Sequence, residues 1–175
     1  MTTTQVDLSQ YIRDIPDFPK PGILFKDITP LLANHFALDA AIGQMYDYYK
    51  DKGISTVVGI ESRGFIFGAP LALRLGASFV PVRKPGKLPY TTEKLEYALE
   101  YGTDALEIHV DAVVPGNPVL ICDDLLATGG TTAATKQLVE KIGGQVIGFA
   151  FLIELSFLDG RSRLPGCDIL SLIKY

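Results

Sequence analysis

The sequence predicts a single α/β domain, residues 1–175, with a doubly wound, mainly parallel sheet and flanking helices. Strand-like and helix-like segments alternate along the chain, which is typical of such sheets. The run VLIC at residues 119–122 is apolar without alternation, as in a strand that is buried on both faces. A length of 175 residues with 47% apolar side chains suffices for one domain with a full core.

The first half of the chain contains four predicted elements. The first residues form an amphipathic segment, with Val6, Leu8, Tyr11 and Ile12 as its apolar side chains. A segment with several prolines follows at residues 16–30. After it we expect a helix at about residues 38–50, a strand at 56–60, a helix at 65–75 despite Pro70, and a strand at 77–82.

The second half begins with a predicted hairpin. Leu95, Tyr97, Leu99 and Tyr101 alternate with polar or small residues, and residues 105–110 can pair with them. The VLIC strand follows. A helix is predicted from about residue 131, since its apolar residues recur at helical spacing and two glycines end it. Residues 146–155 form a further predicted strand.

Composition excludes several classes of protein. The 16 Lys and Arg residues against 20 Asp and Glu residues give a net charge of −4, so no basic surplus favours nucleic acid. The start MTTTQVDLSQ lacks the features of a secretion signal, and no stretch is long enough to span a bilayer. The two cysteines form no disulfide framework, and Cys122 is interpreted as a small apolar strand residue. We expect a cytoplasmic protein that binds neither nucleic acid nor a membrane.

Residues 119–132, VLICDDLLATGGTT, carry the strongest functional signal. They join the carboxyl end of a buried strand to the amino end of a helix, where unpaired backbone N–H groups and the helix dipole suit a phosphate. Gly129 and Gly130 allow close approach of the backbone, and Thr128 and Thr131 can add hydroxyl donors.

Asp123 and Asp124 cannot bind that phosphate, because like charges repel. They suit neutral hydroxyls or a divalent cation, so the pattern indicates a sugar phosphate. The alternative is an ordinary turn capped by Asp and Thr, but it leaves the repulsion between adjacent acids unrelieved. The sequence contains neither GxxxxGK[ST] nor GxGxxG.

Two further segments are candidate anion sites. ESRGF at residues 61–65 also follows a strand and opens a helix, although Arg63 could simply be solvated. Arg83, Lys84 and Lys87 form a basic cluster, for which an ordinary wet surface is an equally good interpretation.

DDLLATGGTT resembles the phosphoribosyl-pyrophosphate signature of the type I phosphoribosyltransferases. Its residues LLATGG after the two acids are similar to those of the adenine phosphoribosyltransferase branch. The resemblance spans nearly the whole chain. It extends in the expected order to DFPKPGILFKDITPLL at residues 17–32, ESRGFIFG at 61–68, VRKPGKLP at 82–89 and LEYG at 99–102.

The resemblance implies a role for each candidate residue. The 5-phosphate would lie on Ala127, Thr128, Gly129, Gly130 and Thr131, and the ribose hydroxyls on Asp123 and Asp124. Pyrophosphate would contact Ser62, Arg63, Arg83, Lys84 and Lys87.

The resemblance also implies mobile and base-binding parts. An N-terminal hood at about residues 1–34 would bind adenine through Leu24 and Phe25, with Arg63 bordering the ring. These apolar residues lie in a loop constrained by prolines, and they could equally pack into the core and anchor the N-terminal segment. A flap hairpin at about residues 84–110 would carry the catalytic Glu100 and its neighbour Tyr101. Whether Glu100 stabilises cationic ribose or manages a purine proton stays open.

The implied activity is transfer of 5-phosphoribosyl from phosphoribosyl pyrophosphate to adenine, giving AMP and pyrophosphate in purine salvage. Mg²⁺ would bind through substrate oxygens and water, with no direct protein ligand. A homodimer is expected. Two alternatives stay open: a sister transferase for another base, and a non-catalytic regulator. The chain has neither the spare length nor the basic arm that a DNA-binding regulator needs.

Overall fold

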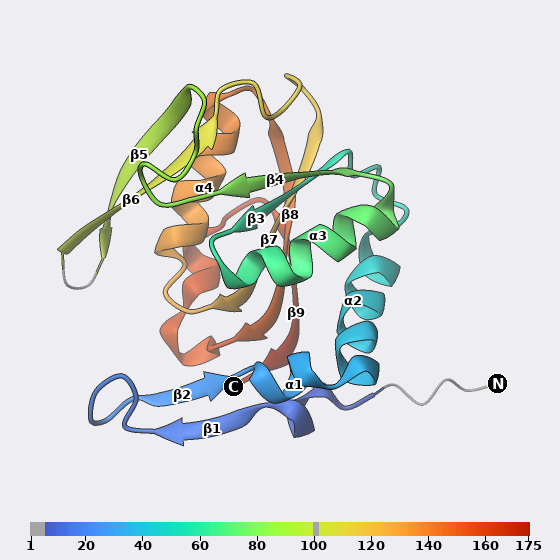
Figure 1. Ribbon diagram of the computed structural model, residues 1–175, viewed down its shortest axis with the longest axis vertical. Coiled ribbons are helices and arrows are strands. Elements are labelled where there is room, and N and C mark those ends of the chain that lie inside the picture. Colours follow the sequence, from blue (N-terminus) through green and yellow to red (C-terminus); the bar gives the residue numbers. More distant parts are fainter. Residues whose placement is uncertain (1–5, 100–101) are drawn as a thin grey trace. The chain divides into compact units, whose positions relative to one another are not determined.

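The computed structural model describes residues 6–99 and 102–175 (Figure 1). The chain divides into two compact units between Gln44 and Met45. Each unit is described separately below.

The first unit contains a small antiparallel hairpin. Its strands pair in register from Arg13 opposite Asp27 to Pro16 opposite Leu24. This pairing was not predicted from the proline-rich sequence. The elements are the 3₁₀ helix η1 (Leu8–Tyr11), β1 (Arg13–Pro16), β2 (Leu24–Asp27), α1 (Thr29–Ala33) and the first turns of α2 (His35–Tyr49).

Helix α2 begins at His35, three residues before the expected start. The side chain of Asn34 explains the difference, because its Oδ1 accepts a hydrogen bond of 3.0 Å from the backbone N–H of Ala37. That geometry is an N-cap, which satisfies one of the donors left unpaired in the first turn of a helix.

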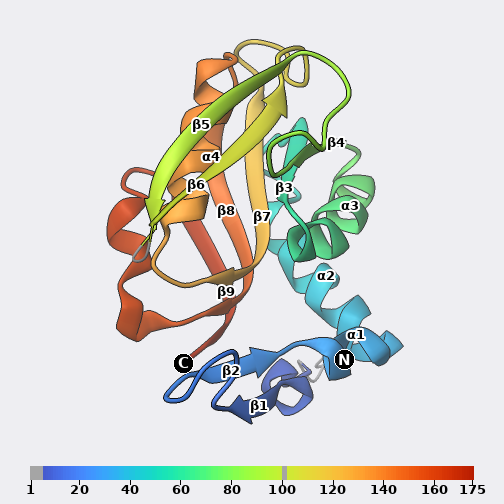
Figure 2. The ribbon, with the colours of Figure 1, turned by 60° about the vertical axis from the view of Figure 1, so that its left-hand side comes forward.

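The second unit contains a five-stranded sheet whose neighbouring strands are all parallel, in the order β4-β3-β7-β8-β9. Helices α3 and α4 lie on opposite faces of it (Figure 2), which confirms the doubly wound α/β class. The elements are β3 (Thr56–Ile60), α3 (Arg63–Leu75), β4 (Ser78–Val82), β7 (Pro118–Leu126), α4 (Gly130–Lys141), β8 (Gln145–Glu154), the 3₁₀ helices η2 (Ser156–Leu158) and η3 (Gly160–Arg163), and β9 (Asp168–Lys174).

The central strands are mainly apolar because both of their faces are covered. All five residues of β3 are buried. In β7, Ile121 belongs to the main core cluster, which includes Leu138 of α4. The side chain of its neighbour Cys122 approaches Gly68 of α3. Both faces of these strands therefore carry apolar side chains, as the sequence pattern predicted.

Two features of the sheet differ from the sequence-based expectation. Strand β9 was not predicted; it lies at the edge of the sheet, and most of its residues are only partly buried. Strand β7 continues through Asp123 and Asp124 to Leu126, beyond the apolar run at residues 119–122 from which the strand was predicted. Pairing with β8 as far as Leu126 keeps this segment extended despite the low strand propensity of Asp.

A separate antiparallel hairpin, β5 (Thr92–Leu99) and β6 (Gly102–His109), matches the predicted one. Its inner face carries the buried side chains of Leu106 and Ile108, which join the main core cluster. Glu100 and Tyr101, the expected catalytic and flap residues, lie outside the described part of the chain. Among residues 6–99 and 102–175, no helix combines the length and apolar character needed to cross a bilayer.

Candidate active site

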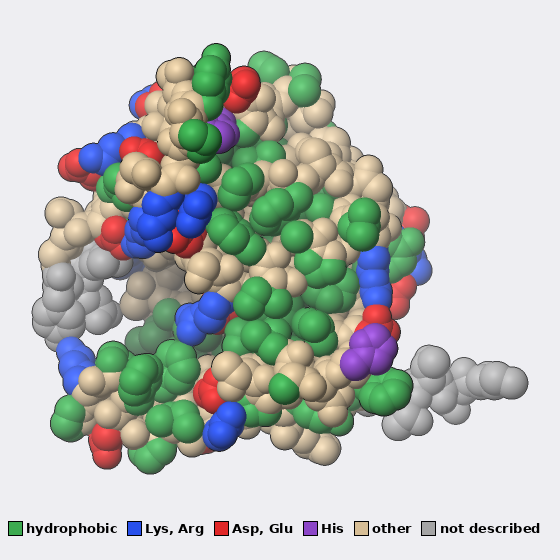
Figure 3. Space-filling view, viewed as in Figure 1, with side chains coloured by type: hydrophobic (Ala, Val, Ile, Leu, Met, Phe, Trp, Pro, Cys, Tyr) green, Lys and Arg blue, Asp and Glu red, His purple; other side chains and the backbone are tan. Residues whose placement is uncertain are grey.

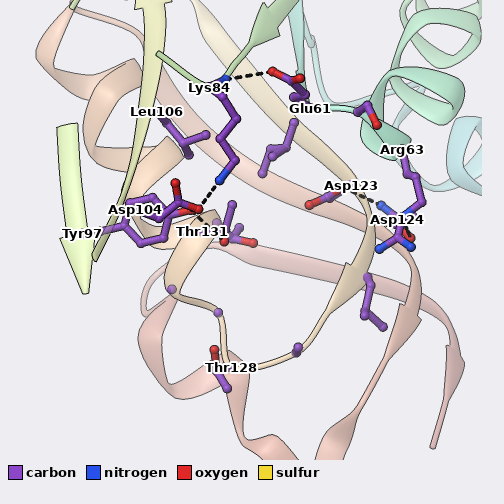
Figure 4. Close-up of a pocket in the computed structure, with 17 residues that line it drawn as sticks. Glu61, Arg63, Lys84, Tyr97, Asp104, Leu106, Asp123, Asp124, Thr128 and Thr131 are labelled. Carbon is purple, nitrogen blue, oxygen red and sulfur yellow. Dashed lines mark hydrogen bonds and ion pairs between the residues drawn. The ribbon is translucent and has the colours of Figure 1, made fainter. Parts of the chain in front are cut away.

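A cavity of about 510 Å³ opens beyond the carboxyl ends of β3 and β7 (Figure 4). Between these two strands the strand order reverses, because the chain runs outward from β3 to β4 on one side and from β7 to β8 on the other. Such switch points are where open α/β sheets bind ligands. Residues 60–63, Lys84, residues 123–132 except Leu126, and three hairpin side chains line the cavity.

The glycine-threonine loop forms one wall, and helix α4 begins at its end with Gly130. Gly129 has a φ of 79°, a left-handed conformation that favours glycine. A side chain at Gly129 would place its Cβ 2.5 Å from the carbonyl oxygen of Gly160. From the sequence, Gly129 was expected to allow a phosphate to approach the backbone closely. The structure adds that this glycine packs against the backbone of Gly160.

Gly160 is a residue of the site region that sequence reasoning missed. A Cβ there would lie 2.2 Å from the carbonyl oxygen of Ala127, so only glycine fits against the loop. Gly160 does not line the cavity but supports the loop from the far side. No local pattern in the sequence marks this contact, since Gly160 lies 31 residues after Gly129.

The two acids at the end of β7 lie on the floor of the cavity. Asp124 is only 5% exposed, and its Oδ2 lies 2.8 Å from Nε of Arg63. Oδ1 of Asp123 accepts a hydrogen bond of 2.9 Å from the backbone N–H of Asp124. Burial raises the pKa of both carboxyls, and the neighbouring charge of Asp124 raises that of Asp123 further. Carboxylates in this setting gain from hydroxyl donors or a cation.

Gly64 brings the ESRGF segment against these acids. A Cβ at Gly64 would lie 2.8 Å from the carbonyl oxygen of Cys122 and 2.9 Å from Oδ1 of Asp123. The amino end of α3 therefore packs directly on β7, with Ser62 and Arg63 facing the cavity. This arrangement unites two motifs that lie about 60 residues apart in the sequence.

The basic segment divides into two parts. Lys84 lines the cavity, whereas Arg83 and Lys87 form ion pairs with Glu61, the first at 3.3 Å between Nε and Oε2. Oε2 of Glu61 also accepts 2.8 Å from the backbone N–H of Lys84. Burial alone would raise the pKa of Glu61, but these donors lower it to about 2. Basic and acidic side chains gather near the end of β4 in the space-filling view (Figure 3).

The hairpin supplies a wall that sequence reasoning missed. Tyr97 and Asp104 are directly opposed in the β5–β6 register, and both line the cavity with Leu106. The Tyr97 hydroxyl donates to Oδ2 of Asp104 at 3.3 Å and lies 3.2 Å from Oγ1 of Thr131. An available signal was the alternation of Asp104, Leu106 and Ile108, which places a charge on an apolar face.

The predicted adenine-binding residues Leu24 and Phe25 belong to the first unit. Leu24 is half exposed, and the ring of Phe25 packs edge-on against Phe18 at 5.1 Å between centroids. Within residues 6–99 and 102–175, no three His, Cys, Asp or Glu side chains gather as ligands for a metal ion.

Comparison with known proteins agrees with this geometry. The phosphoribosyl transferase domain model matches residues 26–164. Adenine phosphoribosyltransferase from Acaryochloris marina is 61% identical over 97% of this chain and 100% of its own length. The crystal structure of the Thermoanaerobacter pseudethanolicus adenine phosphoribosyltransferase is 56% identical, with a TM-score of 0.93 over 96% of this chain and 98% of that one.

A further solved structure is that of the Saccharomyces cerevisiae adenine phosphoribosyltransferase, complexed with an imino-altritol bisphosphate and adenine. It is 41% identical, with a TM-score of 0.88 over 94% of this chain and 96% of that one. On the matched domain and these identities, the chain belongs to the phosphoribosyltransferase family, in its adenine phosphoribosyltransferase branch.

Proposed function

We propose that this protein transfers the 5-phosphoribosyl group of phosphoribosyl pyrophosphate to N9 of adenine, releasing AMP and pyrophosphate for purine salvage. One observation carries the proposal: the glycine-threonine loop at the start of α4 lines the same cavity as Asp123 and the buried Asp124. A phosphorylated pentose would satisfy both features with a single molecule.

The phosphate loop would bind the 5-phosphate through backbone N–H groups of residues 127–131, with the hydroxyls of Thr128 and Thr131 as further donors. Asp123 and Asp124 would accept hydrogen bonds from the ribose hydroxyls. Burial disfavours the charged form of both carboxyls. Hydrogen bonds from two ribose hydroxyls would therefore stabilise these carboxylates more strongly than the same bonds would at a solvent-exposed surface.

Pyrophosphate would lie between the amino end of α3 and the basic segment. Ser62, Arg63 and Lys84 line the cavity and would contact it directly. Arg83 and Lys87 are paired with Glu61, so they would act by adding positive potential around the site or by exchanging partners.

Mg²⁺ fits the donor set of this site. Carboxylate oxygens are hard ligands of the kind that Mg²⁺ prefers, and it retains water readily. Asp123 and Asp124 would hold it through water or through the ribose hydroxyls they bind. When bound, the ion would neutralise negative charge on the departing pyrophosphate.

Chemistry at the ribose would require shielding from water and a group beside the base. We propose that Glu100 and Tyr101 of the flap, residues 84–110, supply these, since a closing lid excludes water from a reactive cation. Leu24 and Phe25 of the hood, residues 1–34, would contact adenine together with Arg63. Hood and flap would serve one catalytic domain, residues 1–175.

We further propose a cytoplasmic homodimer. The exposed face of α3 supports self-association, because Leu73 is 83% exposed and Ile66 is 38% exposed. The surface over α3 is largely apolar in Figure 3. Exposed apolar patches of this kind commonly mark protein interfaces.

An acceptor panel tests the proposed function. The purified protein is mixed with Mg²⁺, phosphoribosyl pyrophosphate and adenine, guanine, hypoxanthine or orotate, and nucleotide formation is followed by chromatography. We expect AMP from adenine at a rate at least tenfold above the other acceptors. Preference for another base would indicate a sister transferase, and no nucleotide with any base would indicate a non-catalytic binding protein.

A further inference from the structure

Asp104 places a carboxylate in the same cavity as Lys84 and the start of α4, where anionic groups are expected to bind. It lies on the inner face of β6, where the next two residues of that face, Leu106 and Ile108, are buried core side chains. Its side chain is 25% exposed and lines the cavity beside Thr131 (Figure 4). A carboxylate in this position repels a phosphorylated ligand, so its presence requires an explanation.

The contacts of Asp104 supply one. Its Oδ2 forms an ion pair with Nζ of Lys84 and accepts the hydrogen bond of 3.3 Å from the Tyr97 hydroxyl. Its Oδ1 accepts 2.8 Å from the backbone N–H of Ala105. Burial opposes ionisation, yet the hydrogen bond from Lys84 and the other donors keep the pKa of Asp104 below its usual range. The carboxylate is therefore charged and holds the ammonium group of Lys84 inside the cavity.

The same contacts connect two parts of the site. Tyr97 donates to Asp104 and also lies within hydrogen-bond distance of Oγ1 of Thr131, in the loop assigned to the 5-phosphate. The hydrogen-bonded series Thr131–Tyr97–Asp104–Lys84 thus crosses from the phosphate loop to the basic segment. A pentose carrying a phosphate at one end and a diphosphate at the other would meet both ends of this series.

We propose that Asp104 is an internal counter-ion that competes with pyrophosphate for Lys84 and so weakens pyrophosphate binding. This inference rests on the proposed function. In the empty site Asp104 neutralises Lys84, and Tyr97 holds the carboxylate in place. When a diphosphate enters, Lys84 turns from the carboxylate to the phosphate oxygens. Departure of pyrophosphate is favoured in return, because Asp104 takes the ammonium group back.

The sign of the effect separates this role from a structural one. Loss of a merely structural carboxylate would disorder Lys84 and weaken pyrophosphate binding. Loss of a competing carboxylate would strengthen it. Asp104→Asn removes the charge but keeps the shape, so we expect the Kd for pyrophosphate to fall about tenfold, the order expected from removing one close charge contact.

The experiment is calorimetric titration of the full-length protein with inorganic pyrophosphate at fixed Mg²⁺. Glu96→Gln is the matched control, because it removes the same charge from β5 of the same hairpin and Glu96 does not line the cavity. We expect its Kd to equal that of wild type. The gain from Asp104→Asn should shrink at least threefold in a Lys84→Met background. Asp104→Ser, with thermal unfolding of each variant, provides a second test if the Asn variant folds poorly.

Unchanged or weaker pyrophosphate binding in both folded Asp104 variants would overturn the inference. An equal gain in the Glu96 variant would also overturn it, since the effect would then be one of net charge. These results are distinct from failure of the proposed function, for which the wild-type protein would make no AMP from adenine and phosphoribosyl pyrophosphate.

Discussion

The two walls of the cavity are built in different ways. The glycine-threonine-loop wall depends on backbone: Gly129 and Gly160 pack without side chains, and α4 begins at the end of the loop. The hairpin wall depends on side chains, with Asp104 and Tyr97 connected to Lys84 from a third segment. Backbone sites need specific residues at fixed spacing, whereas side-chain sites need a fold that brings distant residues together.

This difference determines how each wall should respond to substitution. Changes at the backbone wall should damage binding, because a misplaced loop cannot be repaired by another residue. Changes at the side-chain wall should adjust affinity or pH dependence and leave the rest of the site in place. Four variants, the first of them a double substitution, test this comparison, from the largest expected effect to the smallest.

Asp123→Asn combined with Asp124→Asn should lower turnover about a thousandfold, since the ribose would lose both charged acceptors. The protein should still fold, because the amides keep the shape and no longer repel each other. Steady-state AMP formation and thermal unfolding are the two measurements. Asp47→Asn with Asp51→Asn, both exposed in and after α2, is the matched control. Turnover close to wild type in the first variant would remove the ribose assignment.

Glu100→Ala should lower kcat about a hundredfold while leaving the KM for both substrates within about threefold, as expected for a group that acts mainly in the transition state. Initial rates over a matrix of adenine and phosphoribosyl pyrophosphate concentrations provide both parameters. Glu93→Ala, on the same hairpin, serves as control. If only KM changed, Glu100 would be a binding residue.

Gly129→Ala should raise the KM for phosphoribosyl pyrophosphate about tenfold or more, because the new Cβ would displace the loop from Gly160. Gly166→Ala is its matched control: the two φ angles are 79° and 76°, and a Cβ at Gly166 meets no atom within 4 Å. Both variants should lose about 1 kcal/mol of stability from backbone strain. Equal KM values in the two variants would mean that the Gly160 contact does not position the loop.

Glu61→Gln should have the smallest effect, a loss of about 1–2 kcal/mol of unfolding free energy at neutral pH after allowance for solvent screening. The pKa of Glu61 is about 2, below the ordinary value of 4.5, so its ion pairs stabilise the fold above about pH 4.5. That contribution is lost as pH falls toward 2. Urea unfolding of both proteins between pH 7 and 3 should show a difference that narrows with acid. A constant difference would mean that Glu61 does not act through its charge.

The sequence predicted the backbone wall well because its signals are local. Strand β3 has the predicted bounds, and α3 begins only two residues early. The acid pair, the two glycines and the threonines of residues 123–131 are contiguous and end in a helix. The role of each of these residues could therefore be inferred from its immediate neighbours in the sequence.

The side-chain wall was not predicted, because the pairing register of β5 and β6 determines which of its residues lie next to one another. Tyr97 and Asp104 face each other only because β5 and β6 pair with that alignment. Arg83 and Lys87 have the same charge as Lys84, yet both form ion pairs with Glu61 and neither lines the cavity. The sequence likewise gives no sign of the role of Gly160, because the carbonyl group that it packs against belongs to Ala127, which is distant in the sequence.

The order of strands has a consequence for biosynthesis. Strand β7 lies between β3 and β8 but leaves the ribosome after β4 and the whole hairpin. Until it emerges, the growing chain carries β3, whose residues are all buried in the folded protein, with one unpaired edge, a form prone to aggregation. We therefore expect nascent chains that stop before residue 118 to depend on chaperones, and release from them to coincide with insertion of this strand.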